Sequence, residues 1–122
     1  MAKQYTALVI PVQGPLYELT IDEDQSLETL QAAVGGYIQA VPLPSFIPGA
    51  TRATAYVNEE GKGVLDPNMR ATDYMVPGVG LFFGDYIAGP LVLTGFNPNT
   101  GATAELPAAV IERARLIERE AA

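Results

Sequence analysis

The sequence predicts an α+β fold in one domain, residues 1–122. The expected sheet is mixed or antiparallel, with one short helix after an N-terminal hairpin and a second helix at the C-terminus. Two observations predict the class: the chain opens with two β-branched and aromatic runs, and its helices are separated by pairs of strands. A third predicts one core, since 122 residues with 48% hydrophobic content suffice for a domain without metal or disulfide.

The N-terminal hairpin and the helix after it have the clearest local patterns. Residues 5–10 and 16–21 are predicted strands, joined by a turn that contains glycine and proline. Leu27, Leu30 and Val34 then recur at the spacing of an amphipathic helix. A hairpin followed by a helix is also how a β-grasp begins, so that topology is consistent with this half of the chain.

The ends of this first helix carry specific expectations. Asp24 or Ser26 is expected to cap its N-terminus. Gly35-Gly36 is expected to end it, with one glycine at positive φ because glycine accepts that geometry without strain. The turn would then direct Tyr37 into the sheet.

The second half of the chain is predicted to add three strands and a terminal helix. Residues 37–41 and 53–57 have strand character, and residues 64–80 are expected to form an ordered connection with at most one helical turn. Further strand material lies at residues 81–94, where Gly89-Pro90 calls for an edge or a bulge. Pro107 suits the first position of a helix that buries Val110, Ala114, Ile117 and Ala121.

Missing residue types exclude several chemistries. The chain has no Cys and no His, which rules out disulfides, cysteine nucleophiles, histidine relays and Cys or His metal sites. Ser26 and Ser45 are the serines, and neither has a histidine to activate it. We therefore expect a protein that is not an enzyme and has no cofactor or metal.

The charge balance limits the partners. Seven Lys and Arg against 14 Asp and Glu give a formal net charge of −7. Repulsion from phosphates opposes direct nucleic-acid binding, and no apolar stretch reaches the roughly 18 residues of a membrane span. We expect a soluble, intracellular protein.

Four segments resemble a known family. They are LQAAVGGYIQAVPL at 30–43, NEEGK at 58–62, DPNMRAT at 66–72 and GDYIAGPLVL at 84–93. In this order, over about residues 5–95, they resemble a family of small uncharacterised domains of unknown function from actinobacteria, firmicutes, their phages and mobile elements. Its VGGYI and NEEGK pieces are the more specific ones; the loop 44–52 and the stretch 73–83 are longer than its pattern. The resemblance implies a phage or mobile-element context, in the cytoplasm of the bacterial host or in the virion, and supplies no reaction.

The densest polar cluster is Asn58, Glu59, Glu60 and Lys62. Its carboxylates and amide could bind a cation or another ligand. The alternative is a loop in which Asn58 starts a turn and Gly61 takes positive φ.

Asn68 and Arg70 form a second candidate binding pair. The planar guanidinium of Arg70 could bind a carboxylate or a phosphate. The alternative is that the pair fixes an irregular loop by bonding backbone carbonyls or a nearby acid, such as Glu59, Glu60 or Asp66.

Apolar residues in loops and around the last helix suggest a protein interface, because exposed apolar patches usually mark one. One chain of this size cannot easily bury all of them. The candidates are Phe46, Ile47, Leu81, Phe82, Phe83 and Leu116.

The favoured function is a non-enzymatic phage or mobile-element accessory protein that acts through protein–protein contacts, including self-association as a two-fold dimer. One alternative is an acidic DNA mimic that inhibits a host defence nuclease, with Asp22-Glu23-Asp24 and Glu28 as its acidic group. Another is a small-ligand or metal-binding enzyme around Glu59, Glu60 and Arg70.

Overall fold

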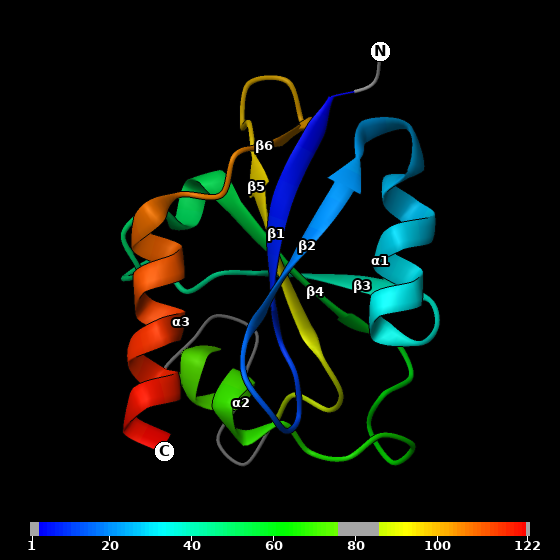
Figure 1. The fold of residues 1–122 in the computed structure, drawn as a ribbon, viewed down its shortest axis with the longest axis vertical. Helices are drawn as coiled ribbons and strands as arrows, with labels where there is room; N and C mark the ends of the chain where they lie inside the picture. The colour runs from blue at the N-terminus through cyan, green and yellow to red at the C-terminus, as the bar shows by residue number, and fades with distance from the viewer. Residues whose placement is uncertain (1–2, 76–85, 122) are drawn as a thin grey trace.

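The computed structural model describes residues 3–75 and 86–121, with side chains up to residue 118. The strands are β1 (Gln4–Ile10), β2 (Tyr17–Asp22), β3 (Ile38–Pro42), β4 (Ala53–Asn58), β5 (Leu91–Phe96) and β6 (Thr103–Ala104). The helices are α1 (Ser26–Val34), α2 (Met69–Met75) and α3 (Ala108–Ala121), with 3-10 turns η1 (Glu23–Gln25) and η2 (Ala50–Arg52) (Figure 1).

The strands form one antiparallel sheet. Its order is β2-β1-β5-β4-β3, and β6 pairs with the end of β5. Every strand pair is antiparallel, which confirms the α+β class and selects the antiparallel sheet from the two types expected. Strand β5 lies between the β1–β2 hairpin and the β3–β4 pair, so the last long strand of the chain joins two halves formed earlier in the sequence.

Helix α1 covers one face of the sheet, as the hairpin-then-helix pattern predicts (Figure 1). Its buried residues are Leu30 and Val34, two of the three positions in the predicted stripe. The third, Leu27, is exposed, so the buried stripe is narrower than expected. The sheet residues beneath the helix are Ala7, Val9, Ile21 and Val92.

The C-terminal end of α1 has the predicted glycine geometry. Gly35 has φ of 80°, and its N–H donates to the carbonyl of Gln31 at 2.9 Å. Two local expectations are wrong. Tyr37 does not enter the sheet but is 70% exposed, and no side chain caps the start of α1 or of η1. Asp22 instead accepts a hydrogen bond from the Gln4 amide across the hairpin, at 2.7 Å.

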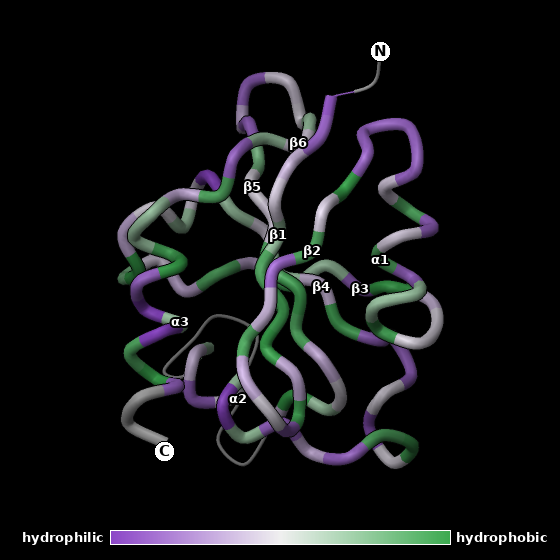
Figure 2. Tube along the Cα trace, viewed as in Figure 1, coloured by the Kyte–Doolittle hydropathy of each residue, from purple (hydrophilic) through white to green (hydrophobic). Residues whose placement is uncertain are grey.

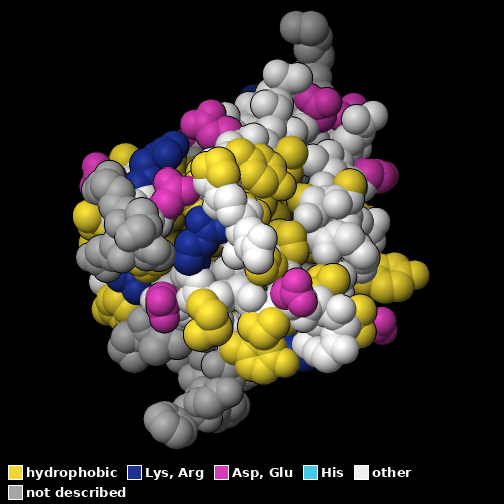
Figure 3. Space-filling model, turned by 60° about the horizontal axis from the view of Figure 1, so that its bottom comes forward, with side chains coloured by type: hydrophobic (Ala, Val, Ile, Leu, Met, Phe, Trp, Pro, Cys, Tyr) yellow, Lys and Arg dark blue, Asp and Glu magenta, His cyan; other side chains and the backbone are white. Residues whose placement is uncertain are grey.

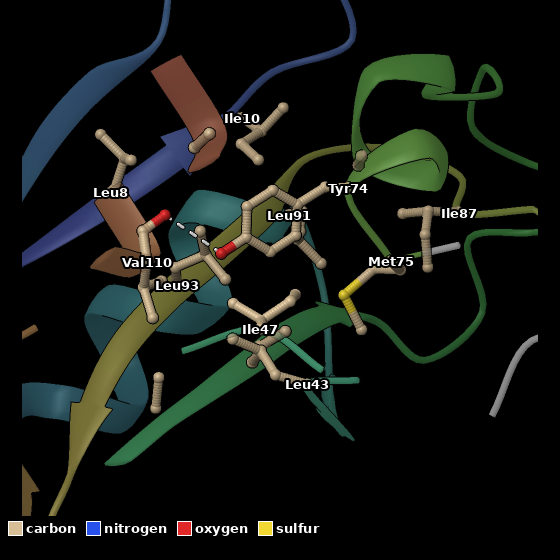
Figure 4. Close-up of a cluster of buried hydrophobic side chains, with 14 of the residues drawn as sticks. Leu8, Ile10, Leu43, Ile47, Tyr74, Met75, Ile87, Leu91, Leu93 and Val110 are labelled. Carbon is tan, nitrogen blue, oxygen red and sulfur yellow. Dashed lines mark hydrogen bonds between the residues drawn. The ribbon is translucent and has the colours of Figure 1, made fainter. Parts of the chain in front are cut away.

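The opposite face carries α2, α3 and the larger part of the core (Figure 1). Leu8, Ile10, Leu91 and Leu93 project from β1 and β5 into this layer, and Tyr74 of α2 lies among them (Figure 4). Hydrophobic residues concentrate in the central strands, whereas α3 alternates hydrophobic and hydrophilic residues (Figure 2). The sheet is therefore a central layer with helices on both faces.

The terminal helix follows its predicted pattern at Val110, Ala114 and Ile117; the side chain of Ala121 lies outside the described residues. Val110 and Ala114 are buried, and Ile117 packs against the same cluster. Leu116 lies away from that stripe and is 50% exposed.

Helix α2 is longer than the single turn expected in residues 64–80. It has seven residues, and its buried ones are Ala71, Thr72, Tyr74 and Met75. Strand β5 begins at Leu91, directly after Pro90, so the proline needs no bulge inside the sheet. Within the described ranges, no helix combines the length and apolar character that crossing a membrane requires.

Candidate functional site

The structure divides the predicted binding residues between separate places. Asn58, Glu59, Glu60 and Lys62 line one pocket of about 210 Å³. Its other walls come from β3, the end of β4 and the chain at 86–88. Arg70 does not line this pocket, so the pocket does not bring Arg70 together with Glu59 and Glu60 as the enzyme alternative requires.

Asn58 shapes the turn beside this pocket. Its amide Nδ2 donates to the carbonyl of Val34 at 3.1 Å, and its Oδ1 accepts from the N–H of Glu60 at 2.8 Å. The second bond is the Asn-initiated turn that the alternative interpretation predicts. The positive φ, however, falls at Gly63 with 82° rather than at Gly61. The close approach of two backbone segments favours glycine at Gly61, because a Cβ there would lie 3.0 Å from the carbonyl oxygen of Ala88.

The charged groups of the pocket are two carboxylates and one ammonium. Glu59 and Glu60 are exposed, and the ammonium of Lys62 lies 5.7 Å from the ring centroid of Tyr86. Within residues 3–75 and 86–121 no three His, Cys, Asp or Glu side chains gather closely enough to hold a metal ion. The arrangement can accept hydrogen bonds from a polar or cationic group, and it offers no activated nucleophile.

Asn68 is completely buried and bonds the chain itself. Its Nδ2 donates to the carbonyls of Ile10 and Gly89, both at 2.9 Å. Its Oδ1 accepts from the N–H of Ala71 at 3.0 Å, which caps the start of α2. The residue ties the end of β1, the chain before β5 and α2 together, so it is structural and not a ligand-binding residue.

Arg70 fixes the turn between β1 and β2. Its Nη2 donates to the carbonyl of Pro11 at 2.6 Å, and its Nη1 lies 3.9 Å from the carboxylate of Glu118. That carboxylate also accepts from the N–H of Leu16 at 2.6 Å. Bonding to a carbonyl and an acid was expected, but the acid is Glu118 of α3 rather than Glu59, Glu60 or Asp66.

The predicted interface residues differ in how exposed the structure leaves them. Phe46 is 51% exposed, and the guanidinium of Arg113 lies 5.0 Å from its ring centroid. Ile47 is wrong as an interface residue: it is 2% exposed because the loop before η2 folds onto the core. Leu116 remains available on α3. Leu81, Phe82 and Phe83 lie outside the described residues.

The sequence does not indicate the buried contact that Tyr74 makes. Tyr74 donates its hydroxyl to the carbonyl of Val110 at 3.1 Å, which joins α2 to α3 (Figure 4). Burial raises the pKa of its phenol far above the ordinary value, and the guanidinium of Arg113, 5.1 Å from the ring, offsets part of the rise. A tyrosine in an expected loop gave no sign of this contact.

The end of the molecule near the β1–β2 turn and α2 has a mixed surface over its described residues (Figure 3). Figure 3 shows its hydrophobic side chains in separate groups with acidic and basic side chains between them. A groove of about 500 Å³ there is lined by Val12, Pro15, Met69, Arg70 and Glu118, among others. Because its two charged groups already bond within the chain, the groove adds no chemistry of its own.

The two edges of the sheet differ. Strand β2 is one edge and carries Glu18 and Asp22; strand β3 is the other and has no charged residue between Ile38 and Pro42. Among the described residues, β3 pairs only with β4. An uncharged edge is a template for another strand, which proteins usually block with charge or a cover.

Comparison with known proteins defines the family and the fold. No curated protein matches the chain significantly. One solved structure, the "small RNA methyltransferase HEN1", is similar with a TM-score of 0.64 at 13% identity, over 94% of this chain and 16% of that chain. The chain thus spans less than a fifth of that protein, and the likeness concerns the fold alone. A family model described as "Domain of unknown function (DUF3846)" matches residues 5–119, and the chain belongs to this family.

Proposed function

We propose that this domain is a non-enzymatic accessory protein of a phage or mobile element, and that it acts by contacting other proteins, including copies of itself. The observation that carries the proposal is the uncharged edge of β3. An added strand makes main-chain hydrogen bonds with such an edge, and pockets beside it accept alternate side chains.

Hollows beside β3 support this mode of binding. Gln39 and Val41 line the pocket that holds Asn58 and Glu59. Ala40 and Pro42 line a second hollow of about 430 Å³. Since successive side chains of a strand point to opposite faces, an added strand would meet hollows through both sets of its side chains.

The polar residues support contact rather than catalysis. Asn68 and Arg70 donate hydrogen bonds to backbone carbonyls, and Asn58 stabilises a turn. The pocket beside β3 therefore serves as a place for a partner's side chain. The protein would work in the cytoplasm of the bacterial host, or in the virion if it is a structural component.

Capture of partners with an edge variant tests the proposal. Tagged protein is expressed in the bacterium whose genome encodes it, as wild type, Ala40→Pro and Thr20→Pro. Proline at Ala40 removes a main-chain donor from the β3 edge, whereas proline at Thr20 does the same on β2. We expect partners, including untagged copies of the chain, that are lost with Ala40→Pro and kept with Thr20→Pro. Equal capture by all three proteins would contradict binding through β3.

The DNA-mimic alternative has one specific observation in its favour. Glu23, Asp24 and Glu28 are all exposed where η1 leads into α1. If this acidic group is the binding surface, replacing the three by Gln and Asn must abolish capture of a basic host nuclease while Ala40→Pro leaves it intact. Loss of capture with Ala40→Pro, but not with the variant of the acidic group, would support binding through β3.

A further inference from the structure

We infer that β3 is a dimerisation strand: it pairs antiparallel with β3 of a second copy, about a two-fold axis at Ala40, and the two sheets become one. The inference rests on the proposed function and names its partner as this same chain. Three features of β3 support it: the outward direction of main-chain groups among the described residues, the absence of charge on the strand, and the exposed ring of Tyr37 at its start.

The main-chain groups of β3 have a self-complementary pattern. The carbonyl of Tyr37 accepts from the N–H of Glu59 at 2.8 Å, so Tyr37 directs its groups toward the β4 side. Because this direction alternates along an antiparallel pair, Gln39 and Val41 also face β4, while Ile38 and Ala40 direct N–H and C=O to the open edge.

A two-fold axis at Ala40 uses every one of the outward donors. The two Ala40 residues exchange a pair of hydrogen bonds, and the N–H of each Ile38 reaches the carbonyl of Pro42 in the other copy. Pro42 has no N–H to offer, so it limits the pairing only at its last position. This register pairs all five residues of the strand, from Ile38 to Pro42.

The charges around β3 favour antiparallel self-pairing. The strand itself is uncharged, so two copies can approach despite a net charge of −7 on each. Glu59 and Glu60 follow one end of the neighbouring strand β4, and Arg52 precedes its other end; all three are exposed. Antiparallel pairing places the acidic end of one copy and Arg52 of the other at the same end of the joined sheet, with both β3 strands between them, so it brings no like charges together. Self-pairing of β2 would instead bring Glu18 and Asp22 of both copies together.

An exposed aromatic ring and an apolar hollow lie at opposite ends of the strand. Tyr37, 70% exposed, directly precedes β3. The 430 Å³ hollow at the far end is lined by Leu43, Ser45, Ala50 and Phe96, among others. In the register centred on Ala40, Tyr37 of each copy lies opposite Leu43 of the other. Side chains of directly opposed residues lie on the same face of the joined sheet, so the ring of Tyr37 meets the second copy beside Leu43 and loses part of its exposure there.

Solution mass and edge variants test the dimer with purified protein. Sedimentation equilibrium across micromolar concentrations should give twice the 12.9 kDa of one chain. Ala40→Lys places two positively charged side chains next to each other at the two-fold axis, and Ala40→Pro removes the main-chain N–H donors there. Both variants should therefore be monomers. Thr20→Lys and Thr20→Pro, matched changes at an outward position of β2, should remain dimers. Tyr37→Ala should raise the dissociation constant roughly tenfold or more, as loss of an aromatic anchor does.

A single introduced cysteine tests the register. The natural chain has none, so Ala40→Cys gives one thiol per copy. Directly opposed residues of a hydrogen-bonded pair have Cα atoms about 5.5 Å apart, so a short bifunctional thiol reagent can join the two thiols. Cross-linking should give a covalent dimer with Ala40→Cys and not with Thr20→Cys.

The outcomes separate this inference from the proposed function. A monomeric wild type, a dimer that survives both Ala40→Lys and Ala40→Pro, or equal cross-linking at positions 40 and 20 overturns dimerisation through β3. If other proteins are still captured through the edge, the proposed function stands without the dimer. Far-UV circular dichroism establishes that each variant is folded, and Ala40→Lys and Ala40→Cys suffice if the proline variant is not.

Discussion

Asn68→Ala should destabilise the protein more than any surface substitution. The asparagine side chain is fully buried and makes three hydrogen bonds, at 2.9, 2.9 and 3.0 Å. Alanine leaves the carbonyls of Ile10 and Gly89 and the N–H of Ala71 without that partner in a dry interior. At about 1–3 kcal/mol for each unsatisfied buried group, the lower half of the range gives a loss of about 3–6 kcal/mol for the three groups. A chain of this length has roughly 6–18 kcal/mol in total, so the loss is a large fraction.

Urea unfolding followed by circular dichroism measures this loss. The midpoint should fall with little change in the slope, and the thermal midpoint should fall by about 10 °C or more. Asn97→Ala, in an exposed turn where the amide oxygen accepts one hydrogen bond from Asn99, is the matched control and should cost about 1 kcal/mol or less. A cost below about 1 kcal/mol for Asn68→Ala would refute the assignment of Asn68 as the residue that joins β1, α2 and the chain before β5.

Three further results are expected. Gly35→Val should cost more than about 1 kcal/mol in urea unfolding, because φ of 80° strains a β-branched residue although the space is open; a smaller cost would contradict the helix end. Burial raises the pKa of Tyr74, so the folded state favours the protonated phenol, and the free energy of unfolding should be constant below a pH of about 10 and fall above it. Tyr74→Phe should lower the free energy of unfolding by about 1 kcal/mol at neutral pH and make the fall above pH of about 10 less steep. If the fall is as steep in Tyr74→Phe, groups other than Tyr74 cause it. Chelation by EDTA should leave the thermal midpoint unchanged, because no metal-holding cluster exists among the described residues; a drop of many degrees would promote the Glu59 and Glu60 pocket to a metal site.

The parts of the fold that the sequence predicts are those with a local pattern. The β1–β2 hairpin needs only two apolar runs and a turn, and α1 needs Leu30, Val34 and a glycine stop. Helix α2 lacks such a pattern, because four of its seven residues are buried and Pro77 and Gly78 follow it closely. Its start did have a signal: Asn68, directly after Pro67, is a common residue at a helix N-cap.

The candidate site was predicted less well because its contacts are non-local. The turn at Asn58 follows from residue types within four positions, and it was expected. The partners of Arg70 are Pro11 and Glu118, 59 and 48 positions away, and no spacing rule connects them. Ile47 stands between Pro44 and Pro48 and looked exposed, yet its loop closes over the core.

An edge strand is likewise a property of the whole topology. Nothing in the sequence of Ile38–Pro42 predicts an edge strand. Among the described residues β3 is outermost because β5 pairs with both β1 and β4. Once the strand order is known, the composition of these five residues can be interpreted as that of an edge strand. Their lack of charge, unremarkable in a central strand, leaves an edge strand blocked only at Pro42. Substitution at Ala40 therefore tests two things together: it can prevent dimerisation without disturbing the β3–β4 ladder only if the outward direction of its N–H, and with it the strand order, is correct.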